Sequence, residues 1–287
     1  MKLGTLFNQK EVVLSIECFP PKEISSYEKM QSVLRNMKTL NPDFISVTYG
    51  AGGSSGGVAS SDIASFLKND LSVESVAHIV CMGSEKDDME KIVQNLKDKK
   101  IENVLALRGD ESPFRPLSKT FKHASDLVTF FKERGDFFIS GACYPEGHPE
   151  SATPKKDVEA LVLKQNAGCD HFFTQLFFDN NIFYRFLNRA RKVGLSRPIS
   201  AGIMPIVRAS QIERTIKLSS ASMPSDFTKM ISRFQNDEKS LFDAGIDYAV
   251  SQIRDLIESG VDGIHLYAMN NFEVAKRVIN GISDLLK

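Results

Sequence analysis

The sequence predicts an α/β fold, a single (β/α)8 TIM barrel with extra helices before the last strand. Eight short apolar runs alternate with segments of helical periodicity, and most runs are apolar at successive positions, as strands buried on both faces require. The first seven runs begin about 31 residues apart, which fits one strand–helix unit each. No linker rich in proline, glycine or serine divides the chain, so residues 1–287 are predicted to form one domain.

The predicted strands share β-branched and aromatic residues. In chain order they are 12–19, 44–49, 75–82, 103–109, 137–145, 171–179, 198–206 and 263–270. An open, doubly wound sheet is the alternative arrangement. It would require a glycine-rich phosphate fingerprint after an early strand, and the glycine-rich segment 50–57 does not match one.

Helical periodicity is clearest over residues 84–98. We expect Ser84 to cap this helix and Asp87 to complete a capping box. Its apolar stripe consists of Met89, Ile92, Val93 and Leu96. The eighth strand begins 65 residues after the seventh, so the extra helices are expected in that interval. The other predicted helical segments are 155–167, 180–193 and the extra helices within 208–259.

Charge and composition exclude several classes of protein. The 36 basic residues balance the 36 acidic ones, so no overall basic field exists to bind nucleic acid or an anionic membrane. No run approaches the ~18 apolar residues of a membrane span, and Lys10 and Glu11 interrupt the N-terminal segment where a signal peptide would be apolar. The four cysteines form no CxxC pair, which favours a reducing, cytoplasmic location.

Polar residues gather where the predicted strands end. In a barrel the active site lies at these C-terminal ends and in the loops that follow. Burying many polar groups there is unfavourable unless they pair with one another or with a ligand. The sequence therefore predicts a small-molecule site built from Glu17, Thr48, Tyr49, His78, Arg108, Asp110, Tyr144, Glu146, His148, Gln175, Asp179, His265, Tyr267 and Asn270.

Glu17 and the Arg108–Asp110 segment are the first candidates for chemistry. A carboxyl inside an apolar strand should have a raised pKa, which suits a general acid; the alternative is a structural ion pair of Glu17 with Arg108. Arg108 can hold an anion, and Asp110 can accept hydrogen bonds from an N–H-rich ring edge. The alternative for that pair is a loop cap with a surface ion pair.

Other candidates have structural explanations as well. Segment 50–57 carries five of the 18 glycines and allows close approach of a ligand, or it is only a flexible connection. His78 and His148 can hydrogen-bond a cofactor or serve as core residues, and His265 is assigned to the core. Gln175 can bind a heterocyclic amide edge or bond to backbone.

A zinc site is a further alternative. Three thiolates near the ends of strands can bind zinc, and Cys18, Cys81 and Cys143 have that placement. However, Glu17 and Cys18 are adjacent in one strand and should face opposite ways. We therefore expect the cysteines to act as small buried apolar residues and predict no metal.

Together these stretches resemble the methylenetetrahydrofolate reductase family. Any one of them is weak evidence, but they occur in the family's order over nearly the whole chain. The matching stretches are SIECFPPK (15–22), FISVTYGAGGS (44–54), AHIVCM (77–82), ALRGDE (106–111), YPEGHPE (144–150), FFTQLFFD (172–179), GIMPI (202–206) and HLYAMN (265–270).

The resemblance implies FAD, NADH or NADPH as electron donor, and reduction of 5,10-methylenetetrahydrofolate to 5-methyltetrahydrofolate by ping-pong hydride transfer. It implies that Glu17 is the catalytic acid, that Asp110 lies near both flavin and pterin, and that Gln175 binds the pterin. It also implies homo-oligomers, because family members self-associate. The residues it implies for holding FAD are Thr48, His78, Arg108, Asp110, Ala142, Tyr144, His148, Asp157, Lys164 and Tyr267.

The sequence also departs from the family pattern. Ala160 and Leu163 stand where related bacterial enzymes have polar or basic flavin contacts, and Asn271 stands where some relatives have Arg. The departures at Ala160 and Leu163 keep a non-catalytic barrel subunit as an alternative. A folate- or pterin-dependent methyltransferase barrel, with zinc held by thiolates, is a separate alternative. No ribose-binding residue distinguishes NADH from NADPH. The printed chain ends at Lys287, so we expect a short form of the family without its C-terminal regulatory region.

Overall fold

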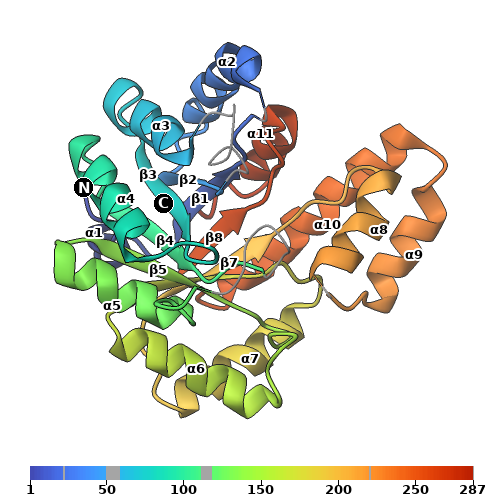
Figure 1. Ribbon diagram of the computed structural model, residues 1–287. Helices are drawn as coiled ribbons and strands as arrows, with labels where there is room; N and C mark the ends of the chain where they lie inside the picture. Colours follow the sequence, from blue (N-terminus) through green and yellow to red (C-terminus); the bar gives the residue numbers. More distant parts are fainter. Residues whose placement is uncertain (22, 50–58, 111–117, 220, 287) are drawn as a thin grey trace.

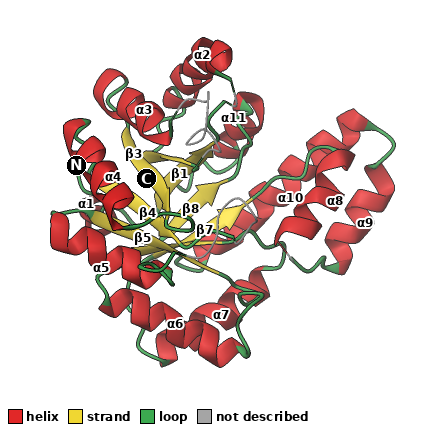
Figure 2. Cartoon of the chain, in the orientation of Figure 1, coloured by secondary structure: helices red, strands yellow, loops and turns green. Residues whose placement is uncertain are grey.

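A computed structural model describes residues 1–21, 23–49, 59–110, 118–219 and 221–286. Eight parallel strands pair in chain order and close into a barrel with β1 against β8 (Figures 1 and 2), which confirms the predicted (β/α)8 fold. That the whole chain forms one domain stays a prediction. The strands are β1 (Val13–Cys18), β2 (Phe44–Val47), β3 (Glu74–Val80), β4 (Asn103–Leu107), β5 (Phe138–Cys143), β6 (His171–Thr174), β7 (Ile199–Ile203) and β8 (Gly263–Leu266).

Every strand ends before its predicted C-terminal limit. The largest differences are at β6, which stops at Thr174, and at β8, which stops at Leu266. After β8 the backbone turns sharply, because Met269 and Asn270 have φ angles of 53° and 57° in the left-handed region. These early ends leave the following residues on the loops at the barrel mouth.

Helices surround the barrel, and three of them, two more than the strand–helix repeat needs, lie between β7 and β8, so the extra helices are where the sequence predicted them. In Figure 1 α8, α9 and α10 extend together away from one side of the barrel. The described helices are α1 (Gly4–Gln9), α2 (Tyr27–Lys38), α3 (Ser60–Ser65), α4 (Lys86–Asp98), α5 (Ala124–Arg134), α6 (Pro154–Asn166), α7 (Asn180–Lys192), α8 (Ala209–Ser219), α9 (Ser225–Phe234), α10 (Glu238–Glu258) and α11 (Phe272–Asn280), with short turns η1 (Ile24–Ser26) and η3 (Phe66–Asp70).

The predicted cap of α4 was wrong by one residue. Glu85, not Ser84, is the capping residue, and Asp88 rather than Asp87 accepts from the Glu85 backbone N–H at 3.0 Å. The Glu85 carboxylate also accepts from the Lys119 backbone N–H at 2.8 Å. The three-residue spacing fits both Ser84 with Asp87 and Glu85 with Asp88, so local spacing alone could not choose between the two caps.

The core has separate layers. A large cluster lies between the outer faces of the strands and the helices, and a smaller one joins α8, α9 and α10 to the ends of β6 and β7. The third fills the interior at the N-terminal end of the barrel, where α1 closes it. Burying each such side chain stabilises the fold by roughly 1.5–3 kcal/mol. This inner cluster consists of Leu3, Leu6, Val13, Phe44, Val76, Leu105, Phe138 and Phe173.

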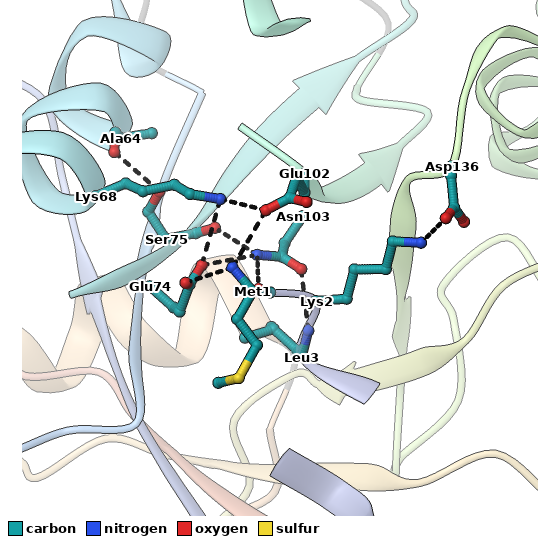
Figure 3. Close-up of polar contacts among 10 residues, drawn as sticks. All are labelled: Met1, Lys2, Leu3, Ala64, Lys68, Glu74, Ser75, Glu102, Asn103 and Asp136. Carbon is teal, nitrogen blue, oxygen red and sulfur yellow. Dashed lines mark hydrogen bonds and ion pairs between the residues drawn. The ribbon is translucent and has the colours of Figure 1, made fainter. Parts of the chain in front are cut away.

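A polar cluster ties α1 to the same end of the barrel (Figure 3). The buried amide of Asn103 accepts from the Leu3 backbone N–H at 3.1 Å and donates to the Ser75 carbonyl at 3.3 Å. Lys68 donates to Glu102 at 2.5 Å. Polar groups at this end are therefore paired, and the helix is held by both packing and hydrogen bonds.

Candidate active site

The upper half of the barrel interior is polar. Alternate residues of a strand face the same side, and on β1 the inward set is Val13, Ser15 and Glu17. Val13 belongs to the inner apolar cluster, Ser15 contacts His265 at 2.7 Å, and Glu17 lines a cavity at the mouth. Going up the strand, the interior thus changes from apolar packing to a carboxyl group.

Glu17 is buried between two histidines. Its side chain makes no hydrogen bond within the described residues, and its Oε2 lies 3.8 Å from His265 Nε2 and 3.9 Å from His78 Nε2. Burial raises the pKa of Glu17 to about 7, with His78 acting in the opposite direction. The alternative ion pair of Glu17 with Arg108 is absent, because Arg108 is bound to Glu150.

Hydrogen bonds fix the orientation of His265. Ser15 Oγ lies 2.7 Å from His265 Nδ1 and 3.2 Å from the Ile264 carbonyl oxygen. His265 Nε2 faces Ser46 Oγ at 3.4 Å and Glu17 Oε2 at 3.8 Å. His265 is a buried core residue as predicted, but its contact with Glu17 was missed. Only the register of β1 against β8 brings Ser15 and His265 together.

Both imidazoles beside Glu17 are poor bases. Burial lowers the pKa of His265 to about 3. Burial also lowers the pKa of His78 to about 4, with Glu17 acting in the opposite direction and His265 adding to the decrease. Because the pKa of Glu17 lies above both values, the proton resides on the carboxyl rather than on either ring.

A cavity of about 320 Å³ opens beside Glu17. Gln175 and Tyr267 line it, so three of the predicted site residues share one pocket. The Tyr267 hydroxyl donates to the Thr174 carbonyl at 2.8 Å, and burial raises its pKa well above the usual value, which keeps it a neutral donor. The sequence did not identify the rest of the lining, which is Phe19, Leu176, Met204, Met269 and, from α8, Ser210, Gln211, Thr215 and Ser219.

A second set of predicted residues lies on the β4–β5–α6 side of the mouth. Arg108 donates from both terminal nitrogens to Glu150, at 2.6 and 2.5 Å. The rings of Tyr144 and His148 meet edge to face, with centroids 4.7 Å apart. Glu150 was not a predicted site residue, although it lies in the quoted stretch YPEGHPE. The Arg108 guanidinium thus lies at the surface of the mouth, and the Glu150 carboxylate partly neutralises its charge.

The remaining members of this set are held by local bonds. Lys164 donates to the Ala142 carbonyl at 2.9 Å, and burial lowers the pKa of its ammonium. Asp157 accepts from the Ser151 hydroxyl at 3.0 Å near the start of α6. Asp110, in the loop that follows β4, is exposed. The first two positions are therefore ordered on α6, while Asp110 faces solvent.

One predicted site residue, Thr48, lies close to the end of a described range, and one predicted feature lies outside the described residues. Thr48 donates its backbone N–H to the Cys18 carbonyl at 3.0 Å and accepts from the Ser60 hydroxyl at 2.6 Å. The glycine-rich segment 50–57 lies outside the described residues. Its expected approach to a ligand stays a prediction.

All four cysteines are buried free thiols. Cys18 packs in the outer cluster, on the opposite side of β1 from the cavity that Glu17 lines. Burial raises the pKa of the Cys18, Cys81 and Cys143 thiols, which makes thiolate formation unfavourable. In the part of the chain that the structure describes, no three or more His, Cys, Asp or Glu side chains are placed to hold a metal ion.

The described helices include none long and apolar enough to cross a membrane. The mouth combines a carboxyl group whose pKa is raised to about 7, a cavity lined by both apolar and polar side chains, and a side where Arg108 and Lys164 lie among acidic residues. Such a site can protonate a bound small molecule and bind an anionic group nearby.

Comparison with known proteins gives consistent matches. The family model for methylenetetrahydrofolate reductase matches residues 2–283. The 5,10-methylenetetrahydrofolate reductase of Pectobacterium carotovorum is 31% identical over 267 residues, covering 93% of this chain and 89% of the relative. The Escherichia coli K12 protein of that name is 30% identical over 267 residues, covering 93% and 89%.

Plant relatives are longer. Methylenetetrahydrofolate reductase (NADH) 1 of Arabidopsis thaliana is 31% identical over 284 residues, which covers 94% of this chain but 48% of the relative. The chain thus spans about half the length of that protein. Among solved structures, a Clostridium thermocellum protein that binds two copies of 5-methyl-5,6,7,8-tetrahydrofolic acid superposes with a TM-score of 0.63 at 15% identity, covering 99% of both chains. At that identity the likeness concerns the fold alone.

Proposed function

The chain belongs to the methylenetetrahydrofolate reductase family, and from this premise we propose that it reduces 5,10-methylenetetrahydrofolate to 5-methyltetrahydrofolate. The observation that carries the proposal is the buried carboxyl of Glu17, whose pKa is raised to about 7 beside the cavity lined by Gln175 and Tyr267. A general acid needs its proton at working pH and needs contact with the substrate. The raised pKa of Glu17 supports the first requirement, and its place in the lining of the cavity supports the second.

We propose that FAD is the cofactor, because the mouth offers groups that suit it. His78 Nε2 is buried without a hydrogen-bond partner within the described residues, and a ligand atom would satisfy it. Arg108 and Lys164 supply positive charge for a diphosphate. When bound, FAD would accept a hydride from NADH or NADPH and pass it to the folate. The proposed contacts are Thr48, His78, Arg108, Asp110, Ala142, Tyr144, His148, Asp157, Lys164 and Tyr267.

The role of Glu17 would be to donate its proton to a nitrogen of the bridged imidazolidine ring of the substrate. Protonation there helps that ring open to the iminium ion that accepts hydride. His78 and His265 would remain neutral throughout, because their pKa values lie below that of Glu17. They keep the proton available to the substrate instead of removing it.

Two further residues would orient the pterin. Gln175 lines the cavity, and its carboxamide can pair with the amide edge of the heterocycle. Asp110 would lie beside both the flavin and the pterin and would accept from ring N–H groups. The exposed position of Asp110 in the described structure is compatible with contact to a ligand at the mouth.

An anaerobic titration tests the proposal. Purified protein is loaded with FAD, NADH or NADPH is added while the flavin absorbance is followed, and methylenetetrahydrofolate is then added. Bleaching followed by recovery is expected, and the faster donor identifies the nicotinamide preference. Bleaching without recovery would contradict the proposed acceptor. Bound metal with no flavin binding would favour the methyltransferase barrel. A protein that binds neither metal nor flavin would favour a non-catalytic subunit.

We also propose that copies of the chain self-associate in the cytoplasm, as the family resemblance implied. Analytical ultracentrifugation at micromolar concentration tests the first statement, and a fluorescent fusion in cells tests the second. A monomer across the concentration range would contradict the expected homo-oligomer.

A further inference from the structure

One side chain binds the backbone at the end of β1 from both directions. The Asn270 carboxamide accepts from the Phe19 N–H through Oδ1 at 3.0 Å and donates to the Phe19 carbonyl through Nδ2 at 2.9 Å. Phe19 lies two residues after Glu17. The two bonds therefore hold the chain just beyond the proposed acid, and we refer to them as the Asn270 clamp.

The clamp continues the seam between β1 and β8 where the strands separate. Their register ends at the pair Ile16 and Leu266. Tyr267, the first residue after β8, donates its N–H to the Ile203 carbonyl of β7. On its other side, β1 is held by the bond from the Thr48 N–H to the Cys18 carbonyl. A side chain thus replaces the missing backbone ladder on the β8 side.

Glu17 depends on this backbone support. Within the described residues its carboxyl has no hydrogen bond, and the Nε2 atoms of His78 and His265 are 3.9 and 3.8 Å from its Oε2. Its position therefore follows from the backbone of β1. Phe19 and Met269, on either side of the clamp, line the same cavity as Glu17. Movement of this seam would displace the acid and two walls of the pocket together.

The local conformation is unusual. Met269 and Asn270 have consecutive φ angles of 53° and 57°, and a left-handed conformation is uncommon for residues other than glycine. Asparagine tolerates this region better than most residues. The left-handed turn is what points the Asn270 amide back at Phe19, and the two bonds offset its cost.

We propose that Asn270 is a positioning residue for Glu17, in that its clamp on Phe19 fixes the end of β1 at the geometry needed for proton transfer to the substrate. The consequence for catalysis rests on the proposed function. The consequence for the position and environment of Glu17 does not, and it can be measured without substrate.

Asn270→Gly tests the proposal because glycine keeps the left-handed backbone and removes both bonds. Displacement of a reacting group by about 1 Å can cost 10²-fold in rate. We expect the folate half-reaction to slow by roughly 10–100-fold through kcat, with the nicotinamide half-reaction within about twofold of wild type. Asn270→Asp keeps the acceptor for the Phe19 N–H and should lose less.

Two readouts are independent of activity. Hydrogen exchange of the Phe19 amide should accelerate in Asn270→Gly, because its acceptor is removed. The pKa of the Glu17 carboxyl, followed by NMR of carbon-13-labelled glutamate, should move from its wild-type value toward that of an exposed glutamate.

Asn103→Ala is the matched control. Asn103 also accepts from a backbone N–H, that of Leu3, and donates to backbone carbonyls, those of Met1 and Ser75, but at the opposite end of the barrel. It should lower stability and leave both half-reactions and the Glu17 pKa unchanged. If Asn270→Gly behaves as this control does, the clamp is only structural and the inference is wrong. If wild type fails to reduce folate, the proposed function fails, and exchange and NMR still test the clamp.

Discussion

The two ends of the barrel differ in how completely a buried histidine is hydrogen-bonded. At the N-terminal end His171 is fully buried and both ring nitrogens are bonded, Nδ1 with Ser140 at 3.1 Å and Nε2 with Ser200 at 2.8 Å. At the mouth His78 is also buried, yet its Nε2 has no partner within the described residues. The buried imidazole at the N-terminal end is thus fully hydrogen-bonded, whereas His78 at the mouth keeps one ring nitrogen without a partner among the described residues.

This difference separates stability from chemistry along each strand. The N-terminal end has the apolar cluster, the closing helix α1 and the paired charges of Figure 3. The mouth has the raised pKa of Glu17, the left-handed turn and the cavity. Substitutions at the N-terminal end should therefore lower stability, and substitutions at the mouth should lower activity, as is usual for barrel enzymes.

The largest expected effect is at the mouth. Glu17→Gln removes the acidic proton while keeping the size of the side chain, and general acid catalysis contributes typically 10²–10⁴-fold. We expect folate reduction to fall by that factor while oxidation of NADH or NADPH continues. Stopped-flow absorbance of the two half-reactions makes the measurement. Equal loss of both half-reactions would refute the assigned role.

The next largest expected effect is a loss of stability at the N-terminal end of the barrel. Leu3 is fully buried in the inner cluster, and Leu3→Ala should lower the free energy of unfolding by roughly 2–5 kcal/mol. Urea unfolding measures this loss, and the rate per folded molecule should be unchanged. Ile24→Ala, at a side chain that is 65% exposed, is the control and should change stability little. A selective loss of rate in Leu3→Ala would mean that the two ends are coupled.

The pH dependence of stability sharpens the comparison. The pKa of Glu17 is raised from 4.5 to about 7 on folding, so the native state retains a proton that the unfolded state loses. Its stabilising contribution is complete below pH 4.5 and is lost as pH rises to 7. The change amounts to roughly 3 kcal/mol. The stability of Glu17→Gln relative to wild type should therefore increase by about that amount between pH 4.5 and 8.

Urea unfolding of both proteins across this range gives the result. The histidines with lowered pKa values act in the opposite direction below pH 6.5, so the difference between variant and wild type is the informative quantity. A pH-independent difference would show that Glu17 titrates normally in the folded state.

The smallest effect concerns Arg108. Its pairing with Glu150 is largely exposed, and such pairs contribute about 0.2–1 kcal/mol. Glu150→Gln should free the guanidinium for the cofactor and tighten FAD binding by roughly 1.5–5-fold. Fluorescence quenching measures it, and riboflavin, which has no phosphate, is the control ligand. Tighter binding of riboflavin as well would exclude a phosphate effect.

Much of the fold was predictable because buried parallel strands have a simple pattern. Strand limits were not, since apolar runs continue past the strands. Phe and Leu residues recur over the run 171–179, but β6 stops at Thr174. Leu176 and Phe178 then pack with α8, α9 and α10 outside the barrel. The helix α1 was missed because six residues carry too little periodicity.

The candidate site was predictable where strand ends alone decide it. Glu17, Gln175 and Tyr267 meet in one cavity because a barrel brings the ends of β1, β6 and β8 together. Contacts that depend on register or on loops were not predictable. The bond from Glu150 to Arg108 and the position of His265 beside Glu17 are of this kind.

The seam between β1 and β8 also affects how the protein is made. Ser15 and His265 meet across it although 250 positions separate them. At 5–20 residues per second a ribosome needs roughly 12–50 s to synthesise the intervening chain. Throughout that time one edge of β1, an apolar strand, has no partner strand. The nascent chain therefore exposes an aggregation-prone edge, which a chaperone that binds extended apolar segments would protect.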